Sequence, residues 1–87
     1  MCRYEGGRLN YVLSLLEELL EGEEYYHHGE VLNSDGRKLL EKILSMLLRD
    51  YPELKAMARR VRRGSTRRDV AKLFERVLSI CEPDLTS

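Results

Sequence analysis

Hydrophobic residues recur at helical spacing in four separate stretches of this 87-residue chain. In the first stretch, residues 8–21, they follow one another at intervals of three and four, which aligns them on one face of a helix. Three glutamates fall on the opposite face. The pattern therefore predicts a helix over residues 8–21 that ends at Gly22. Its apolar stripe comprises Leu9, Val12, Leu13, Leu16, Leu19 and Leu20, and its acidic face Glu17, Glu18 and Glu21.

The second stretch, residues 36–50, predicts a helix with an unusually wide apolar face. Its apolar side chains span roughly 200° of the helix circumference, whereas a surface helix needs an apolar stripe of only about 100°. The helix is therefore central in the fold, or it contributes to a second interface. Four of its residues are candidates for an interface between two copies of the chain: Leu39, Ile43, Met46 and Leu47.

The connection between these helices, residues 22–36, has no helical pattern and is long for a loop in a small bundle. Two interpretations stay open. Either the first helix continues to about Tyr26, or residues 25–32 form a short extended turnback about Gly29. The turn that follows contains small polar residues, and we expect Ser34 or Asp35 to cap the second helix.

The third stretch begins at Tyr51-Pro52, because proline ends the preceding helix and suits the first position of a new one. A helix is expected from Pro52 to Arg63, with a narrow apolar stripe of about 100°. Gly64 suits the left-handed residue that closes it. The members of the stripe are Leu54, Met57, Ala58 and Val61.

A fourth helix is expected after this turn, ending at Pro83. Ser65 or Thr66 caps it, and Asp69 stands three residues after Thr66, as in a capping box. Its apolar face comprises Val70, Leu73, Phe74, Val77, Leu78, Ile80 and Cys81. Together the four stretches predict an all-α fold, a small bundle of about four helices in a single domain over residues 1–87, and a homo-oligomer formed through the second helix.

No apolar run approaches the roughly 20 residues needed to span a bilayer, and residues 1–7 lack the apolar segment of a secretory signal. We therefore expect a cytoplasmic protein without a membrane partner. The net charge is zero, but it is unevenly spread. Residues 1–36 carry two basic against eight acidic residues, and residues 37–87 carry 13 basic against 7 acidic. The first part thus has a charge of −6 and the second a charge of +6.

The basic residues concentrate between Lys55 and Arg68, where seven bases occur without an acid. Arginine side chains match phosphate geometry. The start of the fourth helix adds backbone N–H donors at Thr66, Arg67 and Arg68. We expect a nucleic acid, DNA or RNA, to be bound through its backbone phosphates with little sequence specificity. The candidate binding residues are Lys55, Arg59, Arg60, Arg62, Arg63, Arg67, Arg68 and Lys72.

Two alternatives to this interpretation stay open. In the first, the basic residues pair with an acidic protein surface, within the chain, between two copies or in an adaptor complex. In the second, they form a solvated face. A helix-turn-helix reader of bases is not expected. That motif has small or apolar residues around the turn glycine, whereas this chain has Arg60, Arg63 and Ser65 at those positions.

Catalytic and metal-binding patterns are weak. His27 and His28 are adjacent, so their side chains diverge on a helix or a strand, and neither belongs to a CxxC or HxxxH spacing. Ser65 and Thr66 are explained by helix capping, and Glu17 and Glu18 by a solvated helix face. We expect no enzymatic activity, no metal site and no cofactor.

Overall fold

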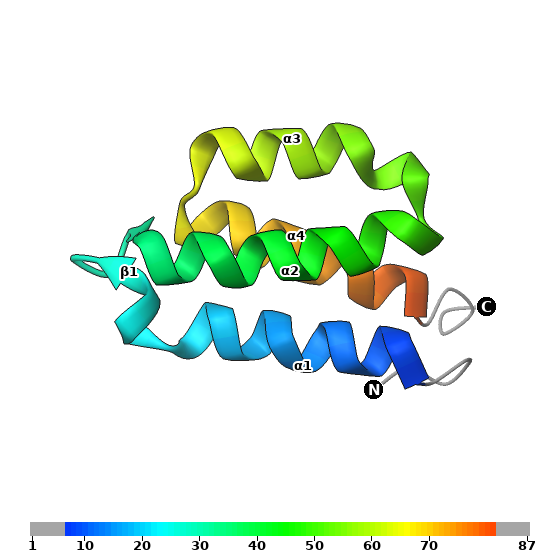
Figure 1. Ribbon diagram of the computed structural model, residues 1–87, viewed down its shortest axis with the longest axis horizontal. Helices are drawn as coiled ribbons and strands as arrows, with labels where there is room; N and C mark the ends of the chain where they lie inside the picture. Colours follow the sequence, from blue (N-terminus) through cyan, green and yellow to red (C-terminus); the bar gives the residue numbers. More distant parts are fainter. Residues whose placement is uncertain (1–6, 82–87) are drawn as a thin grey trace.

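The structure, a computed structural model, describes residues 7–81 of the chain. In this range four α-helices run alternately in opposite directions along one axis (Figure 1). They are α1 (Gly7–Glu21), α2 (Ser34–Asp50), α3 (Lys55–Gly64) and α4 (Arg67–Cys81). The predicted all-α bundle is confirmed. None of the helices in residues 7–81 has the length and apolar character that crossing a membrane requires.

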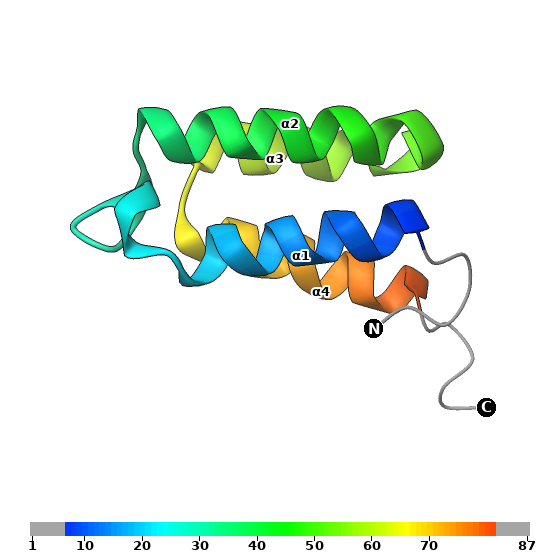
Figure 2. The same cartoon turned by 60° about the horizontal axis from the view of Figure 1, so that its bottom comes forward.

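The helices occupy the four corners of the bundle. Helix α1 packs against α2 and α4, and α4 also packs against α3. Figure 2 shows α2 and α3 in one layer and α1 and α4 in the other. Helices α1 and α3 therefore lie at diagonally opposite corners, as their positions at the bottom and top of Figure 1 also show. The acidic first helix does not cover the basic third helix.

The core accounts for the wide apolar face of α2. Ile43 and Leu47 are 0% and 1% exposed, so they belong to the interior of this fold and offer nothing to a second copy. Leu39 and Met46 are half-buried and pack against the same core. The wide apolar face of α2 is thus used by the core of its own fold, where the helix packs against α1 and the segments that flank it. The fully buried side chains include Leu16, Leu19, Leu32, Leu40, Leu44 and Leu73.

The long connection between α1 and α2 contains a small hairpin, which confirms the extended turnback and not the longer first helix. A 3₁₀ turn, Glu23–Tyr25, leads into strand β1 (Tyr26–His27), which pairs antiparallel with strand β2 (Val31–Leu32). The loop between them turns on His28 and Gly29, whose φ angles of 52° and 73° are left-handed. Glycine adopts such angles without steric cost.

This hairpin is also hydrogen-bonded to the turn between α3 and α4. The Leu32 N–H donates to the Ser65 carbonyl at 2.8 Å, and the Arg67 N–H donates to the Glu30 carbonyl at 2.8 Å. Between these bonds Val31 and Thr66 form an isolated antiparallel bridge. The C-terminal end of the basic segment Lys55–Arg68 is therefore held by backbone hydrogen bonds to the acidic segment 1–36.

The start of α2 differs from the expectation. Its cap is Asn33, not Ser34 or Asp35: the Asn33 Oδ1 accepts from the Gly36 N–H at 2.9 Å. The Asn33 Nδ2 also donates to the Glu24 carbonyl at 2.7 Å. Asn33 is preferred over its neighbours because a single side chain here satisfies the helix start and ties down the preceding 3₁₀ turn.

The α3–α4 turn corrects a second expectation. The left-handed residue after α3 is Ser65, with φ 51°, whereas Gly64 is the last helical residue. The absence of a side chain at Gly64 makes room for the carboxylate of Asp69, which a Cβ at that position would meet. The predicted capping box is confirmed. The Asp69 N–H donates to the Thr66 Oγ1 at 3.1 Å, and the Thr66 N–H donates in return to the Asp69 Oδ2 at 3.4 Å.

The predicted third helix begins with a different geometry. Pro52–Leu54 forms a 3₁₀ turn, and the α-helical part starts only at Lys55. Leu54 is buried in this turn, so it anchors the start of α3 to the core as the apolar pattern predicted.

Candidate functional site

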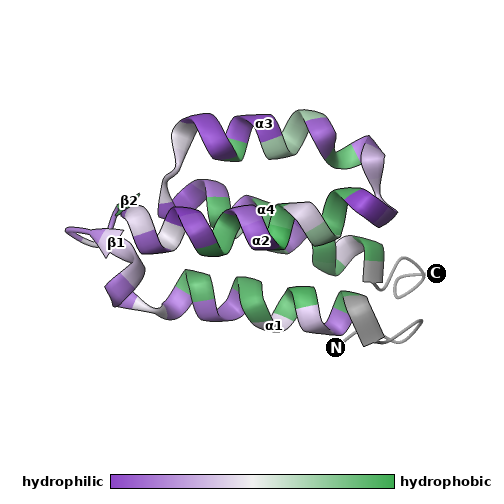
Figure 3. Cartoon of the chain, in the orientation of Figure 1, coloured by the Kyte–Doolittle hydropathy of each residue, from purple (hydrophilic) through white to green (hydrophobic). Residues whose placement is uncertain are grey.

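Helix α3 presents a continuous cationic exterior, which we call the α3 basic face. It consists of Lys55, Arg59, Arg60, Arg62 and Arg63, and all five side chains are exposed. The opposite side of the helix inserts Ala58 and Val61 into the core. The hydropathy colouring of Figure 3 shows α3 as a predominantly hydrophilic ribbon above the green core-facing segments of α2 and α4. The helix has no acidic residue to neutralise this face.

Helix α4 extends the positive surface. Met57 of α3 lines a shallow hollow of about 340 Å³ together with Lys72 and Arg76 of α4. Glu75 and Ser79 complete its wall. Arg76 was not among the predicted binding residues, although its position four residues after Lys72 puts both on one helical face. Arg68 is exposed one turn earlier on the same helix.

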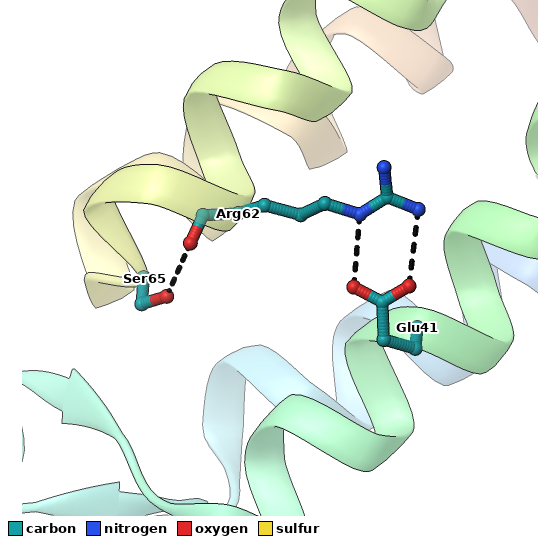
Figure 4. Close-up of polar contacts among 3 residues, drawn as sticks. All are labelled: Glu41, Arg62 and Ser65. Atoms are coloured by element: carbon teal, nitrogen blue, oxygen red, sulfur yellow. Dashed lines mark hydrogen bonds and ion pairs between the residues drawn. The ribbon is translucent and has the colours of Figure 1, made fainter.

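One member of the α3 basic face is already paired. The Arg62 Nε lies 2.8 Å from the Glu41 Oε2, and a second nitrogen of its guanidinium lies 3.0 Å from the Glu41 Oε1 (Figure 4). Glu41 belongs to α2, so this forked ion pair joins two helices. Both side chains are about half exposed, 43% and 55%. Such a surface pair contributes roughly 0–1 kcal/mol to stability, so its main effect is to occupy Arg62.

Arg67 has a different environment from the other predicted binding residues. Its guanidinium carbon lies 4.5 Å from the centroid of the Tyr26 ring. Its side chain is half-buried, and neither the buried Arg67 Nε nor the buried Tyr26 hydroxyl has a hydrogen-bond partner among the described residues. Burial raises the pKa of the Tyr26 phenol, while the adjacent Arg67 guanidinium acts in the opposite direction. Arg67 therefore packs the hairpin against α4.

The start of α4 is less available to an anion than the sequence suggested. The Thr66 N–H faces the Asp69 Oδ2 at 3.4 Å, and the Arg67 N–H is bonded to Glu30. Two of the three expected backbone donors are thus used within the chain, and the Asp69 carboxylate already complements the helix dipole. The expectation of a phosphate held by these amides is wrong for Thr66 and Arg67. Contacts from this surface must come from side chains.

The acidic residues of α1 gather at the opposite corner of the bundle. Glu17, Glu18 and Glu21 are exposed. The Tyr25 hydroxyl donates to the Glu18 Oε2 at 2.8 Å, and this bond raises the pKa of Tyr25. Tyr11 lies on the same helix and is 46% exposed. The acidic residues of α1 and the basic residues of α3 therefore form two separate surfaces in the fold.

The histidines form no site with their neighbours. His27 and His28 are exposed on the hairpin. Within residues 7–81 no three side chains of His, Cys, Asp or Glu come close enough together to hold a metal ion.

Comparison of the chain with protein-family models, with curated proteins and with solved structures found no match.

Proposed function

We propose that this chain is a small cytoplasmic protein that binds nucleic acid through backbone phosphates. The α3 basic face, with Arg68 and Lys72 of α4, would contact a run of phosphates. Arginine forks form bidentate hydrogen bonds with phosphate oxygens, and lysine adds a point charge. The binding has little sequence preference, because contacts to the backbone fix position but do not read bases.

The observation that carries the proposal is the diagonal arrangement of α1 and α3. Had the acidic helix covered the basic one, the cations would be neutralised within the molecule. Instead six of the eight predicted binding residues are exposed and have no ion pair among residues 7–81. They are Lys55, Arg59, Arg60, Arg63, Arg68 and Lys72. Arg62 joins them at the cost of its weak pair with Glu41.

The salt dependence of binding tests the proposal. Fluorescence anisotropy with labelled duplex DNA, single-stranded DNA and RNA is measured between 20 and 200 mM salt. If four to six phosphates are neutralised, log affinity for duplex DNA falls with log salt at a slope of roughly −4 to −5. A flat dependence, or no binding to any of the three at low salt, contradicts the proposal.

A matched pair of variants locates the surface. The triple variant Arg59→Gln/Arg60→Gln/Arg63→Gln removes three cations from the α3 basic face. Because each phosphate contact contributes about 0.9 to the duplex slope, the slope should become shallower by roughly 2 to 3. The control Lys38→Gln/Lys42→Gln/Arg49→Gln removes the same charge from exposed positions of α2. Equal losses in both variants would remove the assignment to α3.

The uncovered acidic face of α1 supports a second candidate function, an interaction module for a basic protein surface. The charge reversal Glu17→Lys/Glu18→Lys/Glu21→Lys separates the two functions. It abolishes binding to a basic protein, whereas it strengthens or preserves binding to nucleic acid. A variant that loses nucleic-acid affinity would contradict the separation of the two surfaces.

A further inference from the structure

The exposed face of α1 combines carboxylates with an aromatic ring. Tyr11 and Val31 are the two large hydrophobic side chains that stand out from the surface of residues 7–81. Tyr11 precedes Glu18 by seven residues, which is about two helical turns, so both lie on the same side of α1. Glu17 and Glu21 lie to one side of this line, on the same solvent-facing arc of the helix, and are also exposed. We call these four residues the α1 acidic face.

This combination is suited to arginine. Carboxylates accept the guanidinium fork, and the face of an aromatic ring attracts a cation. The protein uses both contacts within its own fold. Arg62 forms the forked pair with Glu41, and Arg67 lies 4.5 Å above the ring of Tyr26. An arginine-bearing helix is therefore the partner that the chemistry of the α1 acidic face fits.

The same chain carries such a helix. The α3 basic face has four arginines and a lysine on a helix about 15 Å long, and the α1 acidic face lies on a helix about 22 Å long. Because α1 and α3 occupy diagonally opposite corners, the two faces of one molecule cannot meet each other. We propose that they meet between molecules: the α1 acidic face of one copy binds the α3 basic face of the next.

The geometry also determines the symmetry of this assembly. A two-fold dimer places the same patch of both subunits in one interface, so it would need the acidic and basic faces side by side. Here they point away from each other, and each copy keeps one face unpaired after the first contact. The contact is therefore head to tail and continues into chains or rings. The zero net charge of the molecule removes the general repulsion that would oppose it.

Concentration and salt series in the absence of nucleic acid test the inference. Sedimentation velocity and light scattering are recorded from 10 µM to 1 mM protein at 20 mM and 500 mM sodium chloride. At low salt the mean mass should rise with concentration past that of a dimer. At 500 mM it should return to the monomer mass, because exposed charges are then screened. A monomer throughout, or a closed dimer that does not grow, overturns the proposal.

Charge-reversal variants identify the two faces. Glu17→Lys/Glu21→Lys makes both faces basic, and Arg59→Glu/Arg63→Glu removes most of the positive charge of the α3 basic face, so each variant alone should stay monomeric. Mixed in equal amounts, they should assemble again. The control Lys38→Glu/Lys42→Glu, which reverses charges on α2, should assemble like the unmodified protein. Circular dichroism verifies the fold of each variant, and all six positions are exposed.

Every outcome of the mixing experiment is informative. Assembly by either variant alone, or no recovery on mixing, overturns the pairing of these two faces. The substitution Tyr11→Ala should raise the concentration needed for assembly several-fold, and an unchanged concentration dependence would remove the ring from the contact.

Failure of self-association leaves the proposed nucleic-acid binding untouched, since no nucleic acid is present. If both hold, added duplex DNA should dissolve the assemblies, because it occupies the α3 basic face.

Discussion

Arg67 lies over the ring of Tyr26, with the guanidinium carbon 4.5 Å from the ring centroid. The contact joins the first residue of α4 to the first strand of the hairpin, 41 positions earlier in the chain. It sits beside the backbone bonds from Leu32 to Ser65 and from Arg67 to Glu30. Adjacent arginines in the sequence therefore have different roles: Arg67 holds two segments together, and Arg68 remains on the surface.

Replacement of Arg67 by alanine should destabilise the fold without weakening nucleic-acid binding. The variant loses a partly desolvated cation–π contact and the packing of the side-chain stem, a loss of about 1–2 kcal/mol. Urea denaturation measures the change in the free energy of unfolding. Arg68→Ala is the matched control, because its side chain is exposed. It should leave stability within about 0.5 kcal/mol and reduce affinity instead. The opposite result would assign phosphate contact to Arg67.

The stability of the fold should decrease in alkaline solution. Burial raises the pKa of Tyr26 above its ordinary value of 10.0, and the hydrogen bond to Glu18 raises that of Tyr25. Above pH 10 the unfolded chain therefore loses these protons first, which favours unfolding, whereas below pH 10 both states keep them. The decrease should begin near pH 10 and continue as pH rises toward the folded-state pKa values. Thermal unfolding between pH 7 and pH 11.5 measures it.

The Tyr26→Phe variant isolates the buried phenol. It should flatten part of the alkaline decrease, since one titrating group is gone. At pH 7 it should leave the free energy of unfolding unchanged or raise it by up to about 1 kcal/mol, because the hydroxyl is buried without a hydrogen-bond partner among residues 7–81. A clear loss of stability at pH 7 would show that the hydroxyl has a partner in solution.

Removal of the Asn33 side chain should destabilise the start of α2. Asn33→Ala loses the cap to the Gly36 N–H and the bond to the Glu24 carbonyl, with an expected cost of about 1–2 kcal/mol. Ser34→Ala is the control, since the sequence pattern offered Ser34 as a cap and the fold leaves it exposed. Its effect should stay within about 0.5 kcal/mol. Differential scanning calorimetry compares the two, and similar effects would contradict the assignment of the cap.

Release of Arg62 from its ion pair should strengthen the proposed phosphate contact. Glu41→Gln removes a negative charge next to the α3 basic face and frees the Arg62 fork. The affinity for duplex DNA at low salt should increase several-fold, while stability changes by no more than about 1 kcal/mol. Anisotropy titrations measure the affinity. Glu75→Gln, which removes an exposed acid from α4 beside Lys72, is a useful comparison. An unchanged affinity in Glu41→Gln would remove Arg62 from the binding surface.

The sequence predicted the helices because their periodicity is a local property. Residues three and four apart share a helical face whatever the rest of the molecule does, so the stripes of α1, α3 and α4 could be recognised directly. The capping box of Thr66 and Asp69 was also readable, since both partners belong to one turn. The basic exterior of α3 followed from the same arithmetic, because the core residues Ala58 and Val61 leave the arginines only the outer side.

Features that depend on distant partners were not readable in this way. The sequence did not identify Asn33 as the cap of α2, because one of its two side-chain hydrogen bonds goes to the Glu24 carbonyl in the preceding 3₁₀ turn. The role of Gly64 depends on the Asp69 carboxylate that approaches it, not on a left-handed backbone. Ser65 accepts the left-handed conformation instead. It is held there by the bond from Leu32 and by its hydroxyl, which donates to the Arg62 carbonyl at 2.8 Å.

By itself, the sequence determined that this is an all-α chain with an acidic first helix and a basic third one. Helical periodicity and local charge depend only on residues that are near one another in the sequence. Only the tertiary structure decided how those helices sit relative to one another. In the folded chain Ile43 and Leu47 are buried in the core, and the Arg67 guanidinium packs on the Tyr26 ring of the hairpin. The tertiary structure also put α1 and α3 at opposite corners. The reason is that each helix has one apolar stripe, and the joint burial of four stripes determines which polar faces meet and which stay free.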